Sequence, residues 1–175
     1  MKKNYLFIIA ITLLAASCKN THRSSDNQNG NLTTESFPQF TMINPRGEAV
    51  EFSSLKGKTI FVNLWATWCP PCVAEMPSIE KLYKKTKSEN NAFVLLSLDE
   101  DFEKAKKWVK ARNLDIPIYT TSQLHTLFKV RSIPTTFIFQ PDGKLLFNHV
   151  GMEDYSKPKF EKIMGAQAIN TAAVR

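Results

Sequence analysis

The sequence has few of the residues that metal sites and nucleic-acid surfaces require. Its 175 residues contain only three cysteines and three histidines. A structural zinc site needs four ligands, and the closely spaced pair Cys69 and Cys72 gathers only two. We therefore predict no metal centre. The net charge is +7, but no basic cluster is interleaved with stacking aromatics, which argues against nucleic-acid binding.

A long membrane-spanning run is also missing at the amino terminus. The apolar stretch Tyr5–Ala16 follows Lys2 and Lys3 and stays below the roughly 20 residues that cross a bilayer. A basic start, a short apolar run and then small residues are typical of a secretory signal peptide. We expect residues 1–17 to be removed and the remainder to be exported.

The end of this segment allows two kinds of cleavage. "LAASC", residues 14–18, resembles the bacterial lipoprotein box, in which Cys18 becomes lipid-modified, although Ala15 stands where Leu is usual. Ordinary signal cleavage after Ser17 would instead leave Cys18 as a free thiol. We favour the lipoprotein, because an unpaired exposed cysteine is a liability in an oxidising compartment. The predicted location is the cell envelope, periplasm-facing and lipid-anchored to a membrane.

The rest of the chain divides by composition. Residues 18–36 combine the anchor cysteine with an almost wholly polar stretch that cannot repay its ordering entropy, so we expect a flexible tether. Hydrophobic residues make up 43% of the chain, enough for one core over residues 37–165. No internal repeat is present. The tail, 166–175, is expected to be disordered.

Strand and helix patterns alternate within residues 37–165. A hairpin turn is expected at 44–47, because Pro and Gly separate two extended runs. Buried strands are expected at 57–66 and 92–98, a short strand at 116–120, and two more strands at 135–140 and 144–150. One helix is expected from Cys69 to about Lys87, and a short one over residues 122–130. Between them, a further helix should begin after a cap at Asp99 or Asp101. Ser156, Pro158 and Gly165 frame the last helix. This order predicts an α/β sandwich with a central mixed β-sheet flanked by helices.

Cys69 and Cys72 lie at a predicted strand-to-helix junction and are close enough to form a disulfide. If Cys69 is the helix N-cap, unpaired amides and the helix dipole favour its thiolate, the attacking species in disulfide exchange. Cys72, one turn later, is then placed to resolve the mixed disulfide. Pro70 and Pro71 remove two amide donors, so we expect an only moderately lowered Cys69 pKa and a reductant or mild exchanger.

Two neighbouring residues each allow two interpretations. Glu75 follows Cys72 by three residues on the same helix face. It is either a proton acceptor for Cys72, which a poorly solvated carboxylate would suit, or a solvated surface residue. Trp68 is either a docking surface or plain packing.

The stretch "WATWCPPCVAEMP", 65–77, and its surroundings resemble the TlpA/ResA-like thiol-disulfide oxidoreductases of the thioredoxin superfamily. The likeness covers Phe37 to Met164. It implies a thioredoxin-like three-layer sandwich with an N-terminal β-hairpin and an insertion over 101–119. It also implies that Cys69 and Cys72 are catalytic.

The resemblance extends to "RSIPTTFIF", residues 131–139, which matches the surroundings of that family's cis-proline. This nominates Pro134 to face the cysteines and Ile133 to offer its backbone to a substrate strand. Together with Trp68, Pro70 and Pro71, these residues form the predicted substrate-binding set.

One position departs from cytoplasmic thioredoxins, which carry a buried Asp six residues before the first cysteine. Here that residue is Asn63, which cannot accept a proton at neutral pH. In the ResA-like branch a glutamate matching Glu75 lies near the cysteines, and this favours Glu75 as a catalytic residue.

The predicted function is an extracytoplasmic thiol-disulfide oxidoreductase that reduces disulfides of exported proteins, with apocytochrome c, and hence cytochrome c maturation, as one candidate. Its expected partners are those proteins and a membrane thiol electron donor, and the chain is expected to be a monomer. The Cys69–Cys72 disulfide is the redox centre, and no cofactor is expected. The alternative is a copper-binding chaperone on the same fold. Such proteins use C-x-x-x-C with a distant histidine, and His125 and His149, the histidines considered for that role, are better explained as ordinary helix or strand residues. The peroxiredoxin pattern P-x-x-x-T-x-x-C is absent.

Overall fold

A computed structural model describes residues 37–165 of the chain. The predicted signal peptide 1–17, Cys18, the tether up to residue 36 and the tail 166–175 lie outside the described residues. Within residues 37–165, none of the helices has the length and apolar character needed to cross a bilayer.

The described part begins with a hairpin, as the sequence predicts. Strand β1 (Thr41–Ile43) pairs antiparallel with β2 (Ala49–Glu51). In the turn, the Asn44 side-chain carbonyl accepts the backbone N–H groups of Arg46 and Glu48. Gly47 has φ +82°, in the left-handed region that glycine enters without strain. A single 3-10 turn, η1 (Phe52–Leu55), leads from the hairpin toward the central sheet.

The central sheet has five strands in the order β5-β4-β3-β6-β7. Their bounds are β3 Thr59–Trp65, β4 Asn91–Ser97, β5 Ile118–Tyr119, β6 Thr135–Phe139 and β7 Leu145–Val150. Strands β3, β4 and β5 are parallel, whereas β6 and β7 run antiparallel to their neighbours. The predicted mixed sheet is confirmed, and every residue of its middle strand β3 is buried.

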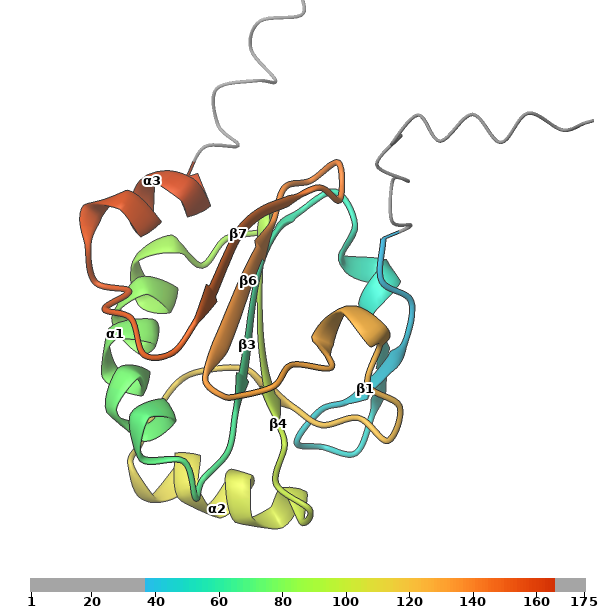
Figure 1. Cartoon of the computed structure of the whole chain (residues 1–175), viewed down its shortest axis with the longest axis vertical. Coiled ribbons are helices and arrows are strands. Elements are labelled where there is room, and N and C mark those ends of the chain that lie inside the picture. The colour runs from blue at the N-terminus through green and yellow to red at the C-terminus, as the bar shows by residue number, and fades with distance from the viewer. Residues whose placement is uncertain (1–36, 166–175) are drawn as a thin grey trace, which may run out of the picture. The chain divides into compact units, whose positions relative to one another are not determined.

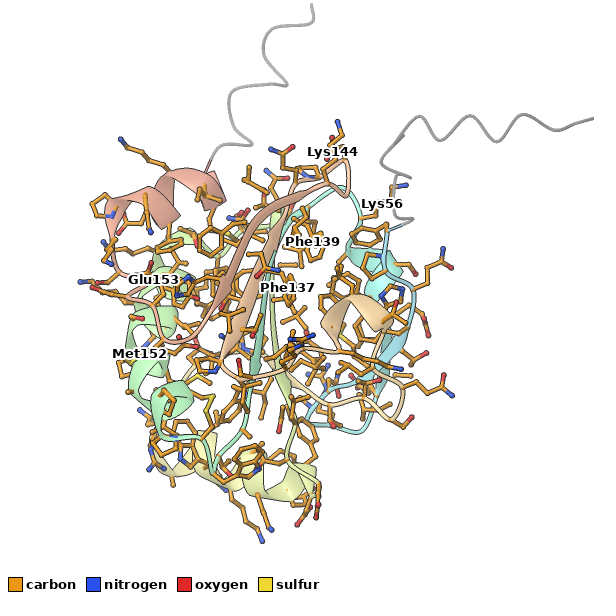
Figure 2. The ribbon with its side chains drawn as sticks, viewed as in Figure 1. Lys56, Phe137, Phe139, Lys144, Met152 and Glu153 are labelled. Atoms are coloured by element: carbon orange, nitrogen blue, oxygen red, sulfur yellow. A yellow bond between two sulfur atoms is a disulfide. The ribbon has the colours of Figure 1, made fainter. Side chains whose placement is uncertain are left out.

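The sheet separates two apolar clusters. Helices α1 (Pro70–Thr86) and α3 (Pro158–Gly165) cover one face, and the hairpin with the η turns covers the other, as Figure 1 shows. Phe61 and Trp65 of β3 point toward the helices, whereas their neighbours Ile60, Val62 and Leu64 pack toward the hairpin. Phe137 and Phe139 of β6, labelled in Figure 2, join the hairpin-side cluster. Because side chains alternate along a strand, Asn63 faces the helices.

One predicted helix is wrong. Residues 122–130 contain only a single 3-10 turn, η2 (Thr126–Phe128), on which the His125 ring nitrogen Nδ1 accepts the Leu127 N–H. The physical reason lies in Phe128, which is fully buried against the rings of Phe40, Phe52 and Phe137. Placing the Phe128 ring beneath the hairpin requires only one 3-10 turn, after which the chain continues in an extended conformation.

Helix α2 (Phe102–Ala111) follows β4, and its cap is Asp101, whose carboxylate accepts the Glu103 N–H at 2.9 Å. The sequence left the choice between Asp101 and Asp99 open. Asp99 does not cap the helix because it holds the loop that leads to the cysteines.

Candidate active site

The loop between β3 and α1 is tied to the end of β4. Asp99, which is buried, accepts hydrogen bonds from the Thr67 hydroxyl at 2.6 Å and the Thr67 backbone N–H at 3.1 Å. The Ser97 hydroxyl donates to the same carboxylate at 2.8 Å. These bonds fix the backbone one residue before Trp68, so Asp99 determines where the chain enters α1. No local sequence pattern pointed to this contact beyond the charge of Asp99.

Cys69 is the N-cap of α1, in the position that the sequence predicts. Its backbone is extended (φ −99°, ψ 102°), and its Sγ accepts the backbone N–H of Cys72 at 3.3 Å. Pro70 and Pro71 occupy the first two helical positions, so the first amide able to reach the sulfur belongs to Cys72. The dipole of a 17-residue helix points its positive end at this sulfur.

Cys69 and Cys72 are joined by a disulfide. Both cysteines are buried, but Cys69 is 4% exposed and lines a surface groove, whereas Cys72 is completely buried and does not line it. An incoming thiolate or disulfide can therefore meet Cys69 but not Cys72. This asymmetry supports the predicted division into an attacking and a resolving cysteine.

A second loop lies against Cys69. The peptide bond between Ile133 and Pro134 is cis, as the family resemblance implied, and the Ile133 carbonyl oxygen lies 3.8 Å from Cys69 Sγ. A groove of about 520 Å³ runs beside the disulfide; Trp68, Pro70, Pro71, Val130, Arg131 and Ile133 are among its lining residues. Trp68 is 66% exposed, which excludes the packing interpretation. The substrate-binding roles of these residues stay predictions.

Glu75 lies inside the protein, one helical turn beyond Cys72. Its side chain is buried, with the residue only 2% exposed, and this excludes a solvated surface glutamate. One carboxylate oxygen, Oε1, accepts the Asn63 amide at 2.7 Å, and Oε2 accepts the Glu153 N–H at 3.2 Å. Burial raises the pKa of Glu75 to about 7, and these two hydrogen bonds oppose the rise. Glu75 can therefore both take up and release a proton near neutral pH.

Two further side chains extend the contact between Asn63 and Glu75. The Asn63 amide also donates to Thr136 Oγ1 at 2.9 Å, and the Tyr155 hydroxyl donates to the same oxygen at 2.6 Å. All three residues are buried, and they come from β3, β6 and the segment before α3. Sequence reasoning treated Asn63 only as a missing aspartate and did not identify Thr136 or Tyr155, because nothing in the local patterns links positions so far apart.

The solvent side of Glu75 is covered by the segment between β7 and α3. Figure 2 labels Met152 and Glu153 of this segment, and the Tyr155 N–H of the same segment donates to Ser78 Oγ on α1 at 3.1 Å. The Gly151 N–H donates to the Pro134 carbonyl at 2.8 Å, and the Glu153 N–H donates to Glu75. A short stretch of backbone thus contacts both the cis-proline loop and the buried carboxylate.

The two histidines considered for copper lie in structural positions. His125 accepts a hydrogen bond from η2, and His149 lies on β7 opposite Thr136. Among residues 37–165, no three His, Cys, Asp or Glu side chains gather closely enough to hold a metal ion. The predicted cofactor-free site stays a prediction.

The sequence is similar to a known family and to characterised relatives. The Redoxin family model matches residues 32–164. A thiol-disulfide oxidoreductase ResA of Bacillus cereus is 34% identical over 116 residues, which cover 65% of this chain and 67% of the relative. ResA of Bacillus subtilis (strain 168) is 33% identical over 111 residues, 62% of each chain. This chain thus spans about two thirds of the length of these relatives.

Solved structures share the fold. A thiol:disulfide interchange protein of the thioredoxin family from Chlorobium tepidum TLS superposes with a TM-score of 0.62 at 26% identity, covering 74% of this chain and 92% of the other. StoA from Bacillus subtilis gives 0.61 at 23% identity, covering 73% and 96%. The predicted thioredoxin-like sandwich is therefore confirmed.

Proposed function

This chain belongs to the Redoxin family and is a thiol-disulfide oxidoreductase, and we propose that it works outside the cytoplasm as a reductase of disulfides in exported proteins. The observation that carries the proposal is the unequal burial of the two sulfurs beside an open groove, with a buried carboxyl that titrates near neutral pH one turn behind them. An accessible nucleophile, an enclosed resolving thiol and a nearby proton acceptor are what the two steps of disulfide reduction require.

The reaction follows from the geometry in two exchanges. In the reduced protein, the Cys69 thiolate attacks one sulfur of a substrate disulfide, and the other substrate sulfur leaves as a thiolate. Cys72 then transfers its proton to Glu75 and attacks Cys69 Sγ. The Cys69–Cys72 disulfide forms and the bond between Cys69 and the substrate sulfur breaks. That sulfur keeps the electron pair and leaves as the second substrate thiolate. The substrate gains two electrons, and the protein returns to the form seen here.

The direction of electron flow is part of the proposal. A strong oxidant stabilises its reduced thiolate with several donors. Pro70 and Pro71 contribute no N–H, and the Cys72 amide is the hydrogen bond that reaches Cys69 Sγ. A modestly stabilised thiolate favours electron donation to substrates. The site would then be re-reduced by a membrane thiol donor, since an oxidising compartment keeps no soluble reductant pool.

The location and the substrates rest on features outside the described fold. The signal-like segment 1–17 and the lipoprotein-like Cys18 support export and anchoring to a membrane of the envelope. The groove beside Ile133 suits an extended substrate segment, whose backbone would align with that residue. Apocytochrome c is one candidate among exported proteins with paired cysteines.

The test of this function is to trap the mixed disulfide. In Cys72→Ser, Cys69 can attack a substrate disulfide but nothing resolves the product, so envelope proteins should stay covalently attached and be released by a reductant. The double variant Cys69→Ser/Cys72→Ser, which lacks both active-site thiols, is the control. Adducts that are nonspecific, or equal in the two variants, would refute the reductase function.

Trp68 provides a second prediction, on substrate docking. Because the residue is 66% exposed, Trp68→Ala should change the free energy of unfolding by no more than about 0.5 kcal/mol. We expect KM for a protein disulfide to rise about 10-fold, the loss of roughly 1.4 kcal/mol of contact, with little change for a small disulfide such as oxidised glutathione. Leu145→Ala, which truncates an exposed apolar residue on β7, is the matched control. Equal losses with both substrates would contradict a docking role.

A further inference from the structure

Asn63 uses its whole donor capacity on two partners. It is completely buried in the middle of β3, and its Nδ2 group donates one hydrogen to Glu75 Oε1 at 2.7 Å and the other to Thr136 Oγ1 at 2.9 Å. An amide group has two such hydrogens. Nothing else in the site donates a side-chain hydrogen bond to Glu75 within residues 37–165, since its other partner is the backbone of Glu153.

The other end of the same amide has no partner. Asn63 Oδ1 is buried and accepts no hydrogen bond from residues 37–165. A buried acceptor without a donor is costly and calls for a compensating reason. This cost is offset by the hydrogen bond that Asn63 Nδ2 donates to the Glu75 carboxylate, because a hydrogen bond to a charged acceptor is stronger than one between neutral groups.

Thr136 and Tyr155 fix which way the amide faces. Burial raises the pKa of Tyr155 above its ordinary value, so its hydroxyl keeps its proton and donates to Thr136 Oγ1 at 2.6 Å. The Thr136 oxygen accepts this bond and a second one from the Asn63 amide. With the amide turned over, the Asn63 oxygen would face the ionised Glu75 carboxylate with no hydrogen between them, and both donated bonds would be lost. The two acceptors thus favour the orientation in which the donor end of Asn63 faces Glu75, and Tyr155 holds the Thr136 oxygen in place.

We propose that Asn63, oriented by Thr136 and Tyr155, is a positioning residue that holds Glu75 in its ionised form and so sets the pH range over which Cys72 can give up its proton. The inference rests on the proposed role of Glu75 in the resolving step. In that step Cys72 loses a proton to Glu75, attacks Cys69 Sγ and expels the substrate thiolate. Asn63 touches none of the reacting atoms and acts through the carboxylate that receives the proton.

Other titratable groups also lie near Glu75 and bear on its pKa. Cys72 precedes it on α1, and Tyr155 and Glu153 approach from the segment before α3. Glu153 is held ionised by Lys157 and by Lys159, and its charge raises the pKa of Glu75. His149 lies one strand away, opposite Thr136. Within residues 37–165, only Asn63 and the Glu153 backbone lower the pKa of Glu75 by donating to it.

The decisive experiment titrates Glu75 directly, by carbon-13 NMR of its carboxyl carbon in the oxidised protein. Asn63→Leu keeps a similar volume and removes the donor. Because a hydrogen bond to a charged group contributes roughly 1.5–3 kcal/mol, the Glu75 pKa should move up by about one to two pH units. In single-turnover assays the resolving step should slow by about 5- to 50-fold at pH 7 and recover at higher pH, since the ionised fraction falls accordingly.

Three variants distinguish a positioning role of Asn63 toward Glu75 from a purely structural role. Thr136→Val removes the oxygen that orients the amide, and it carries the test alone if Asn63→Leu does not fold; a smaller upward shift is expected. Thr59→Val alters a buried polar residue at the far end of β3 and should leave the titration unchanged. In a Glu75→Gln background, Asn63→Leu should no longer change the pH profile of resolution.

Two results would overturn the inference. One is a Glu75 titration that stays in place in both Asn63→Leu and Thr136→Val, and the other is a pH profile that still shifts in the Glu75→Gln background. Failure of the proposed reductase function would give a different result. The unaltered dithiol would then exchange with no substrate disulfide at any pH, while Asn63→Leu would still shift the NMR titration of Glu75.

Discussion

Cys69→Ser is expected to lower the rate of disulfide reduction by at least about 1,000-fold. A serine hydroxyl is not ionised at neutral pH, so the attacking species is lost. Cys72 cannot take over the attack, because this residue of the first turn of α1 is completely buried. The measurement is the steady-state reduction of a model protein disulfide by the reduced domain, followed against the unaltered protein.

Cys72→Ser is the matched control, because it removes the other sulfur and leaves the nucleophile. It should retain a single rapid attack and stop at the mixed disulfide, whereas Cys69→Ser should show no attack at all. If Cys69→Ser forms mixed disulfides through Cys72 at a comparable rate, the burial asymmetry does not govern the chemistry, and the assignment of the two roles is wrong.

Glu75→Gln is expected to slow the resolving step by about 100-fold at pH 7. The buried carboxyl titrates near neutral pH, where a proton acceptor contributes most, and removing such a group costs roughly 100- to 10,000-fold. Glutamine keeps an oxygen that can accept from Asn63 but cannot take a proton from Cys72. Single-turnover release of the substrate thiol measures the step. A rate within about threefold of the unaltered protein would exclude Glu75 as the acceptor.

The same substitution should change how stability depends on pH. The folded pKa of Glu75, about 7, lies above its ordinary value of 4.5, so the folded state holds a proton that the unfolded state releases. This stabilisation is fully present below about pH 4.5 and is lost as the pH rises through 7. Glu75→Gln removes the effect and should gain about 2–3 kcal/mol relative to the unaltered protein between pH 5 and pH 8.

Urea unfolding at pH 5 and pH 8 measures this gain. Glu89→Gln makes the same charge change at an exposed position and is the control for net charge. A difference between Glu75→Gln and the unaltered protein that stays constant with pH would contradict a carboxyl that binds a proton on folding.

The strands and helices were largely predictable because each has a strong local pattern. Five of the seven residues of β3 are apolar and all seven are buried, and Cys69 with two following prolines marks the start of α1. The segment 122–130 had a weaker pattern, and there a tertiary contact decided the outcome, because burial of Phe128 beneath the hairpin limits the chain to one turn.

The candidate site was predictable only in part. Cys69, Cys72, Glu75 and Pro134 could be selected from motifs and resemblance, because each belongs to a short stretch with recognisable neighbours. Asn63, Thr136 and Tyr155 could not, since 73 residues separate the first two and their pairing depends on β3 lying beside β6. Asp99 was considered only as a helix cap, and its contact with Thr67 joins the ends of two adjacent strands.

The sequence alone determined that a cysteine pair stands at the start of a helix, within a chain of alternating strands and helices, because these features are local and written in consecutive residues. Only the tertiary structure decided that Cys72 and Glu75 are enclosed while Cys69 borders a groove. It also decided that the amide of Asn63 donates a hydrogen bond to the buried carboxylate. Exposure and proton affinity depend on what packs around a group, and in this protein those neighbours come from strands and loops far apart along the chain.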